Sequence, residues 1–423
     1  MPKLKICSAL PVGTESNTAL GVTKDAGATL NTTTDRWEMD TSAAHSLNGR
    51  ALGSPGNPTG YGDLTFVVGM SVRFDSGTVV HGHYLYRDSV ANSTHYGYKY
   101  SESAGVITIE FVYADVSQGT VTFPVAENHR LLVFCDATVA NGNSTPFTVV
   151  LDSTVEINVT ATNNTGSTID ISNGAGTWGE SSGIASSTVV ISVWDAFAGF
   201  TDRDDPVGHL TKTHWPLSTG VTPPTGYDEG TKSSGTDAAA LVDERPPNGT
   251  GTTDSDEFTL IDGTGTRLQA VALGNSLLAA GDILMGLQVI LWDRGTSQSK
   301  VVSSKCGFHD GTTYTPASDE GEDQGSLVSL TGITSYAEHL AGGNEGIFAT
   351  LAPDGAQLSA KGNTYLDGMF CVVEALGSSD NNASLRVSTV IVEALIEASG
   401  DGLDALDDPP VAAAGETVQV LIV

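Results

Sequence analysis

The stretch that decides the fold is LTFVVGMSVRF, residues 64–74. Most of its side chains are apolar, and several are β-branched or aromatic, the types that suit a pleated and buried surface. Gly69 interrupts the run at a point where a β-bulge is expected. Because polar, turn-forming residues bound the run, it predicts one long buried strand.

Shorter runs of the same kind lie on both sides of this strand. VITIEFVY (106–113) and STVVISVWDAF (187–197) belong to a series of about ten, spaced by turn-forming residues. No convincing helical period appears among them. This part of the chain therefore predicts a β-sandwich of the jelly-roll type.

A second set of strand-like runs follows a proline-punctuated stretch, in which Trp215 and Tyr227 are expected to anchor packing. Within this second set, residues 335–340 are expected to form a short helical turn. The fold class predicted is all-β, with two β-sandwich domains joined by a proline-rich connector. The predicted parts are an N-terminal arm (1–36), a concanavalin-like sandwich (37–200), the connector (201–250), a second β domain (251–398), and a C-terminal link with a terminal strand (399–423).

The composition excludes several classes of function. The formal net charge is −31, with only 19 lysines and arginines in 423 residues, so the chain is expected to repel nucleic acid and anionic bilayers. No apolar run approaches the ~18–20 residues of a membrane span, and the N-terminus lacks a secretory h-region. The four cysteines lie far apart, which favours buried thiols over a metal site or a disulfide framework. We expect synthesis in a cytoplasm.

Signatures of catalysis are missing from the sequence. There is no nucleophile elbow, zinc-protease motif or phosphate-binding loop. Glycosidases on such sandwiches need two carboxylates about 5.5 Å apart. No E-x-D-x-x-E pattern occurs, and Glu110 has no second acid near it on its strand face. These absences predict that the protein is not an enzyme and has no catalytic residues.

The hairpin at 81–100 carries the most distinctive side chains. Tyrosines alternate along both of its strands, so several share a face, where stacked rings and nearby polar groups would hold a sugar ring. The alternative is that one aromatic face packs into the sandwich core. His81 and His83 also share a face as in a metal pair, but no third ligand is evident. The candidate glycan-binding residues are Tyr84, Tyr86, Asp88, His95, Tyr96 and Tyr98.

Acidic clusters supply candidate metal ligands. Hard cations such as calcium need several oxygen ligands that converge on one point. No cluster has the spacing of the twelve-residue calcium loop, so most of these carboxylates are expected to be solvated turn residues. The alternative is that calcium binds at the DRDD turn (202–205) or at the DSDE segment (254–257). No other cofactor is expected. The candidate metal ligands are Asp202, Asp204, Asp205, Asp254 and Asp256.

The segment ETVQVLIV (416–423) reads as a strand with alternating apolar residues. Such a strand either completes a sheet of its own domain or adds to a sheet of a neighbouring molecule. The lysines of the N-terminal arm are placed to contact an acidic neighbour. The candidate assembly residues are Lys3, Lys5, Val418, Val420 and Ile422.

Two motifs together resemble a recurrent connector of tailed-phage structural proteins. THWPLSTG (213–220) and LVDERPPNGTGTTDSDEF (241–258) match it through their prolines and through Val242, Asp243 and Glu244, although a 19-residue insertion, TPPTGYDEGTKSSGTDAAA, separates them. The preceding sandwich, from RAL (50–52) onward, resembles the concanavalin-like (laminin-G-like) domain of these proteins. The resemblance covers roughly residues 37–310. It implies a virion component whose sandwich contacts glycan or protein, and it brings no catalytic residues.

The function predicted from the sequence is that of an exterior structural component of a phage virion, associated with the tail or a fibre. Its partners would be other virion proteins, copies of itself and host-surface polysaccharide, without nucleic acid or membrane insertion. One alternative is a capsid decoration protein or head fibre. An alternative from another class is a free-standing carbohydrate-binding protein or glycosidase. Fold analogy alone supports the outward role.

Overall fold

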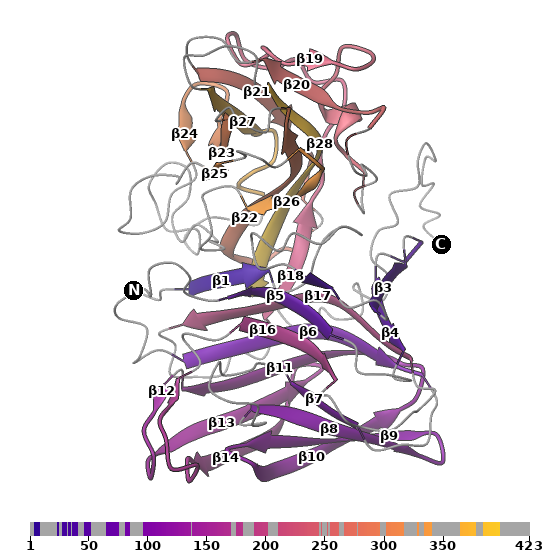
Figure 1. Cartoon of the computed structure of the whole chain (residues 1–423), viewed down its shortest axis with the longest axis vertical. Coiled ribbons are helices and arrows are strands. Elements are labelled where there is room, and N and C mark those ends of the chain that lie inside the picture. The colour runs from indigo at the N-terminus through magenta and orange to yellow at the C-terminus, as the bar shows by residue number, and fades with distance from the viewer. Residues whose placement is uncertain are drawn as a thin grey trace.

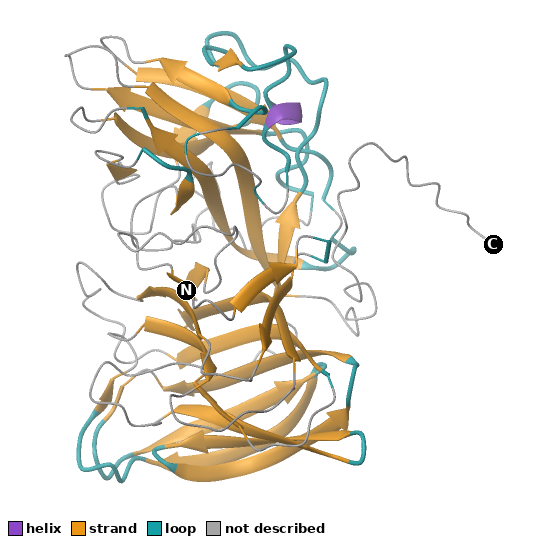
Figure 2. Cartoon of the chain, turned by 45° about the vertical axis from the view of Figure 1, so that its right-hand side comes forward, coloured by secondary structure: helices purple, strands orange, loops and turns teal. Residues whose placement is uncertain are grey.

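The computed structural model shows a chain built almost entirely of strands, as predicted (Figure 2). In the part of the chain that the structure describes, the one helix is a 3-10 turn, η3 (Ala239–Leu241), and no helix is long and apolar enough to cross a membrane. The described residues are 4–8, 23–24, 28–31, 33–34, 36–40, 46–51, 65–75, 81–84, 96–136, 138–170, 175–180, 190–201, 210–244, 247, 252, 254–261, 266–276, 278–296, 302–316, 328–329, 334–340, 364–377 and 384–397.

The first unit is a sandwich of two antiparallel sheets with a small accessory pair, β12 (Thr138–Val139) and β15 (Ile169–Asp170). The eight-stranded sheet runs β14 (Thr154–Thr162), β13 (Ser144–Leu151), β11 (Asn128–Asp136), β6 (Thr65–Phe74), β17 (Val190–Thr201), β4 (Arg36–Asp40) and β3 (Ala28–Asn31), with β1 (Leu4–Ser8) paired to β17. The seven-stranded sheet runs β10 (Val116–Pro124), β9 (Val106–Tyr113), β8 (Tyr96–Ser103), β7 (His81–Tyr84), β16 (Ala175–Glu180), β5 (Ser46–Ala51) and β2 (Thr23–Lys24).

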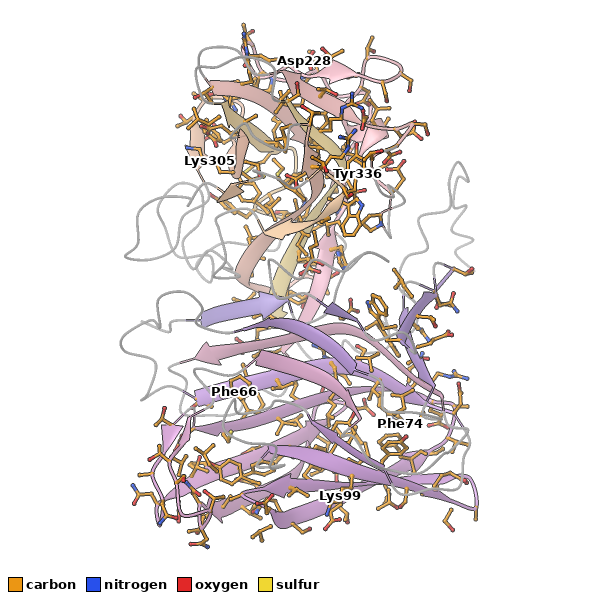
Figure 3. The ribbon with its side chains drawn as sticks, viewed as in Figure 1. Phe66, Phe74, Lys99, Asp228, Lys305 and Tyr336 are labelled. Atoms are coloured by element: carbon orange, nitrogen blue, oxygen red, sulfur yellow. The ribbon has the colours of Figure 1, made fainter. Side chains whose placement is uncertain are left out.

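The long strand β6 lies in the middle of the first sheet, between β11 and β17. Alternate residues from Phe66 to Phe74 point into the core between the two sheets (Figure 3). Val67, on the opposite face, is also buried, because that face is covered by the second unit. Burial on both faces explains why this strand reads as a nearly continuous apolar run.

The second unit is a smaller sandwich whose core contains Cys306 and Cys371 between its sheets. The six-stranded sheet runs β19 (Thr231–Lys232), β20 (Phe258–Ile261), β28 (Ser384–Glu397), β22 (Ile283–Gly295) and β26 (Ala337–Leu340), with β18 (Leu210–Trp215) also paired to β28. The five-stranded sheet runs β21 (Thr266–Ala272), β27 (Phe370–Gly377), β23 (Val302–His309) and β24 (Tyr314–Pro316), with β25 (Val328–Ser329) paired to β23.

Several segments have more regular structure than the sequence predicts. Within the predicted connector, residues 210–215 are strand β18, and Trp215 lies in the second core with its indole Nε1 donating to the Gly274 carbonyl at 3.1 Å. Residues 337–340, expected as part of a helical turn, form strand β26. Pairing with the outer edge of β22 satisfies the backbone groups of β26, so tertiary context overrides the local pattern.

The two sandwiches pack against each other, one above the other (Figure 1). The outer face of the eight-stranded sheet meets the lower ends of β18, β22 and β28. The apolar contact is one cluster drawn from both units: Val67, Leu132, Phe134 and Val150 from the first, and Leu210, Ile283 and Leu395 from the second.

Candidate functional site

The tyrosine hairpin proposed from the sequence contributes to the first core. Tyr98 is 4% exposed, and its ring lies 6.2 Å from that of Phe111. Tyr100 is 1% exposed and packs against Phe74. Tyr98 is therefore a core residue and is not available to a ligand at the surface. Of the other candidates, Tyr84 and Tyr96 lie in β7 and β8 without described side chains, and Tyr86, Asp88 and His95 lie outside the described residues.

Two of the five candidate metal ligands can be placed. Asp254 Oδ1 accepts a hydrogen bond from the Asp256 backbone N–H at 3.0 Å, which is the geometry of a local turn. Among the described residues, no group of three or more His, Cys, Asp or Glu side chains could hold a metal ion. Asp202, Asp204 and Asp205 lie outside the described residues.

Of the candidate assembly residues, Lys5 lies in β1 opposite Phe200 of β17. The others, Lys3, Val418, Val420 and Ile422, lie outside the described residues.

A different group of side chains, on the outer face of the five-stranded sheet, has the composition of a ligand-contacting surface. Phe370, His309 and Tyr314 lie in register on three neighbouring strands, β27, β23 and β24. Tyr227, from the segment before β19, packs on this row. We call Tyr227, His309, Tyr314 and Phe370 the aromatic patch.

The rings of the aromatic patch contact one another closely. The Tyr227 ring meets the His309 ring edge-on, with centroids 4.5 Å apart, and lies 5.9 Å from the Tyr314 ring. His309 meets Phe370 at 6.5 Å, also edge-on. His309 and Phe370 are buried, whereas Tyr227 and Tyr314 are partly exposed. The two tyrosines therefore present aromatic surface to solvent over a fixed base.

The backbone around Tyr227 holds it in place. The Ala270 N–H donates to the Tyr227 carbonyl at 2.7 Å, and the Glu229 N–H donates to the Leu268 carbonyl at 3.0 Å. The segment at Tyr227 thus follows the edge of β21, with an isolated bridge between Asp228 and Gln269. The His309 ring is oriented by the Gly311 N–H, which donates to Nδ1 at 2.9 Å, so the neutral imidazole carries its proton on Nε2.

A charged pair lies beside the aromatic patch, on the same sheet face. Glu374 accepts from the Tyr314 hydroxyl at 3.0 Å through Oε2 and pairs with Lys305 Nζ at 3.2 Å through Oε1. Burial and the nearby Glu374 carboxylate raise the pKa of Tyr314 above its ordinary value, so its hydroxyl remains a hydrogen-bond donor. Lys305 lies at one side of the second sandwich, and Asp228 lies near its top (Figure 3).

Two further ion pairs involve the residues that follow Tyr227 in the chain. Asp228 accepts from Lys232 Nζ at 2.6 Å and from Gln269 Nε2 at 3.0 Å. Burial alone would raise the pKa of Asp228, but these hydrogen bonds and the lysine charge outweigh it and lower the pKa. Glu229 pairs with Arg267 at 3.0 Å.

The second chemically distinctive region lies where the segment before β20 meets the six-stranded sheet. Burial, followed by the charges of Asp254, Asp243 and Asp256, raises the pKa of Glu244 to about 7. Nearby, Glu257 accepts from the Tyr336 hydroxyl and from Arg386 Nη1 at 2.6 Å.

The Tyr336 hydroxyl and the Glu244 carboxyl differ in their chemistry. Burial and the Glu257 charge raise the pKa of Tyr336, so its phenol stays protonated and serves as a donor that links β20, β26 and β28. Burial and the like negative charges of the neighbouring carboxylates favour the protonated form of Glu244, so its pKa lies at about 7. The connector motif thus places its glutamate among other acids.

Comparison with protein-family models and with curated protein sequences finds no match. Solved structures with a similar fold include Trypanosoma rangeli sialidase, with a TM-score of 0.31 and 11% identity over 48% of this chain and 31% of that one. The GH131 β-glucanase catalytic domain from Podospora anserina gives 0.28 and 11% over 47% of this chain and 85% of that one. The family 131 glycoside hydrolase domain from Coprinopsis cinerea gives 0.28 and 9%, over 48% and 84%.

These comparisons correct one prediction. The sequence predicts that the protein is not an enzyme, and this exclusion is wrong, because the solved structures with a similar fold include a sialidase and two glycoside hydrolase domains. A missing two-carboxylate pattern on one strand does not exclude catalysis, since acids can also gather outside a single strand, as Asp243, Glu244, Asp254 and Asp256 do. The likeness concerns the β-sandwich fold and assigns no activity. None of the three is a virion protein, so the phage origin stays a prediction.

Proposed function

We propose that the protein binds carbohydrate and that the aromatic patch is its contact surface. The observation that carries the proposal is the pair of partly exposed rings, Tyr227 and Tyr314, fixed beside the Glu374–Lys305 pair. A sugar ring has an apolar face of C–H groups and a rim of hydroxyls. Aromatic rings contact the first, and fixed polar groups orient the second.

The charges around the aromatic patch favour a neutral sugar. The carboxylate on the sheet face of the patch, Glu374, is paired with Lys305, and the two carboxylates that follow Tyr227 in the chain are paired as well, Asp228 with Lys232 and Glu229 with Arg267. The chain as a whole carries −31 charges, which repel acidic polysaccharides.

The test is titration of the full chain with neutral oligosaccharides chosen from a glycan array. Tyr227→Ala and Tyr314→Ala should each weaken binding by about fivefold, since an aromatic contact is worth roughly 1 kcal/mol. Tyr227→Phe keeps the ring and should bind within about twofold of the original protein. Thermal unfolding checks that each variant is folded, and release of reducing ends from the same mixtures reports hydrolysis. Unchanged binding by both folded alanine variants would rule out the patch as the contact surface.

A second candidate function is that of an exterior structural component of a tailed-phage virion, as the connector motif suggests. The observation that favours it is the apolar contact between the sandwiches, which would present both as one unit in each copy on a particle. Mass spectrometry of purified particles should find the chain, and imaging should place it on the outside. Its absence from particles would eliminate this candidate without affecting the carbohydrate proposal.

A further inference from the structure

His309 lies beneath the two partly exposed rings of the aromatic patch. It is 4% exposed, and the Tyr227 ring packs edge-on against it with centroids 4.5 Å apart. Tyr314 lies directly opposite His309 in the pairing of β23 with β24. Histidine is also the residue type whose charge ordinarily changes near neutral pH. A change at the imidazole therefore reaches both of the tyrosines that the patch presents to solvent.

A single hydrogen bond ties the turn between β23 and β24 to this imidazole. The Gly311 N–H donates to Nδ1 at 2.9 Å, from a residue whose φ of +92° favours glycine. The Asp310 carboxylate closes the turn by accepting from the N–H groups of Thr312 and Thr313 at 2.8 and 2.7 Å. Because Tyr314 follows this turn directly, the position of the turn determines where the Tyr314 ring lies.

Only the neutral imidazole can accept the hydrogen bond from Gly311. The free lone pair of the neutral ring is on Nδ1, so an added proton goes to that atom and turns it into a donor. Two N–H groups then face each other with their nitrogens 2.9 Å apart. The imidazolium would also lie against the rings of Tyr227 and Phe370 in a mostly buried position, where a charge is costly. Protonation of His309 therefore forces the ring or the turn to move.

The surrounding charges do not replace the lost hydrogen bond without disturbing the turn. Among the described residues, the titratable groups that face the imidazole are the phenols of Tyr227 and Tyr314 and the Asp310 carboxylate. The carboxylates on the neighbouring elements are already paired, Glu374 with Lys305, Asp228 with Lys232 and Glu229 with Arg267. Asp310 Oδ1 holds the two turn amides, so an ion pair between Asp310 and the imidazolium would pull on the same turn.

We propose that His309 is a positioning residue of the carbohydrate-binding surface, which holds Tyr227 and Tyr314 in place while its imidazole is neutral and releases them when it is protonated. Sugar binding is then strongest at neutral and weakly alkaline pH and weakens as the pH falls. The inference rests on the proposed function for its ligand, and it adds control of that same surface by pH.

The first test is titration of the full chain with a neutral oligosaccharide at about pH 5 and about pH 7.5, within the range where histidines ordinarily change charge. Binding should be at least about fivefold weaker at the lower pH, because the apparent affinity falls with the fraction of protein in the competent state. The background for all variants is Glu244→Gln, because the Glu244 carboxyl titrates at about 7 in the same domain.

Two substitutions at His309 separate positioning from a merely structural role. His309→Asn places an amide oxygen near the position of Nδ1, so it can accept from Gly311 without titrating, and His309→Phe keeps a ring without an acceptor. Both should bind more weakly at about pH 7.5 and lose the pH dependence, whereas a structural role would lower affinity and leave the pH dependence. His129→Asn is the matched control, since His129 pairs with Asp152 at 2.7 Å in the first sandwich, and it should behave as the background does.

The second test needs no sugar. Amide hydrogen exchange of the turn at 310–314, corrected for the intrinsic rate, should be at least about fivefold faster at the lower pH and should not respond to pH in His309→Asn. If no sugar binds at any pH, the carbohydrate proposal fails, and exchange still decides whether His309 controls the turn. Equal sugar binding at both pH values, or a pH response that persists in His309→Asn, would overturn the inference. If His309→Phe fails to fold, His309→Asn decides.

Discussion

At the scale of single residues, Glu244 is the group whose titration should be visible in stability. Its pKa is raised from an ordinary 4.5 to about 7, so the folded state holds the proton more tightly than the unfolded state does. The folded state is therefore favoured below the unfolded pKa, and this advantage is lost as the pH rises through the folded pKa. Glu244 is only about half-buried, so solvent screening reduces the effect to about 1–2 kcal/mol.

Glu244→Gln should remove the loss of stability that accompanies deprotonation of Glu244. The variant should exceed the original protein by about 1 kcal/mol in free energy of unfolding at about pH 8 and match it at about pH 4. Urea denaturation at the two pH values measures the difference. Glu156→Gln, on the exposed face of β14, is the control for removing one carboxylate from an acidic protein. Equal gains in both variants would point to net charge as the cause.

At the scale of elements, the Glu257–Tyr336–Arg386 link joins strands that are far apart in sequence. Tyr336 is 1% exposed, and its hydroxyl donates to Glu257, so Tyr336→Phe leaves a buried carboxylate short of one donor. The expected loss is about 1–3 kcal/mol of unfolding free energy. Tyr314→Phe breaks a similar bond to Glu374 at a partly exposed tyrosine and should cost less than about 1 kcal/mol. Urea denaturation compares them, and equal losses would mean that burial does not decide the cost.

The elements also show which features a sequence can predict. The strand at 65–74 was recognisable because its apolar pattern is local. Strand β26 was not, because its strand form depends on the edge of β22, which is some fifty residues earlier in the chain. The same limit applies to the aromatic patch. Tyr227, expected as a packing anchor, meets His309, and His309 meets Phe370, only through sheet pairing between distant segments, and no local motif indicates this.

The hairpin tyrosines show what strand alternation leaves undecided. Alternation along 96–100 correctly places Tyr98 and Tyr100 on one strand face, but alternation does not say which face is solvated. The register decides it, because Tyr98 pairs with Phe111 of β9, and both side chains then point into the core. When a face carries large aromatic side chains on three adjacent strands, burying it gives a lower free energy than exposing it to water.

At the scale of the whole molecule, the packing between the sandwiches determines whether the chain unfolds as one unit. Phe134 is 4% exposed and lies on the outer face of β11, so its contacts are with the second sandwich rather than with the core of the first. Truncation of such a side chain costs about 3–4 kcal/mol where the site cannot collapse. The substitution should weaken the contact between the two sandwiches rather than either sandwich itself, because the residues that fill each core are left unchanged.

Phe134→Ala should therefore split thermal unfolding into two transitions, with the second sandwich melting earlier, where the original protein shows one. Differential scanning calorimetry measures this, and amide hydrogen exchange followed through the melt assigns the earlier transition to one sandwich. Val159→Ala, at a 38% exposed position on β14 remote from the contact, should leave a single transition within about 1 °C. A single, uniformly lowered transition in Phe134→Ala would mean that the residue stabilises the first sandwich alone. Two transitions would establish that this apolar contact joins two separately folding sandwiches into one cooperative molecule.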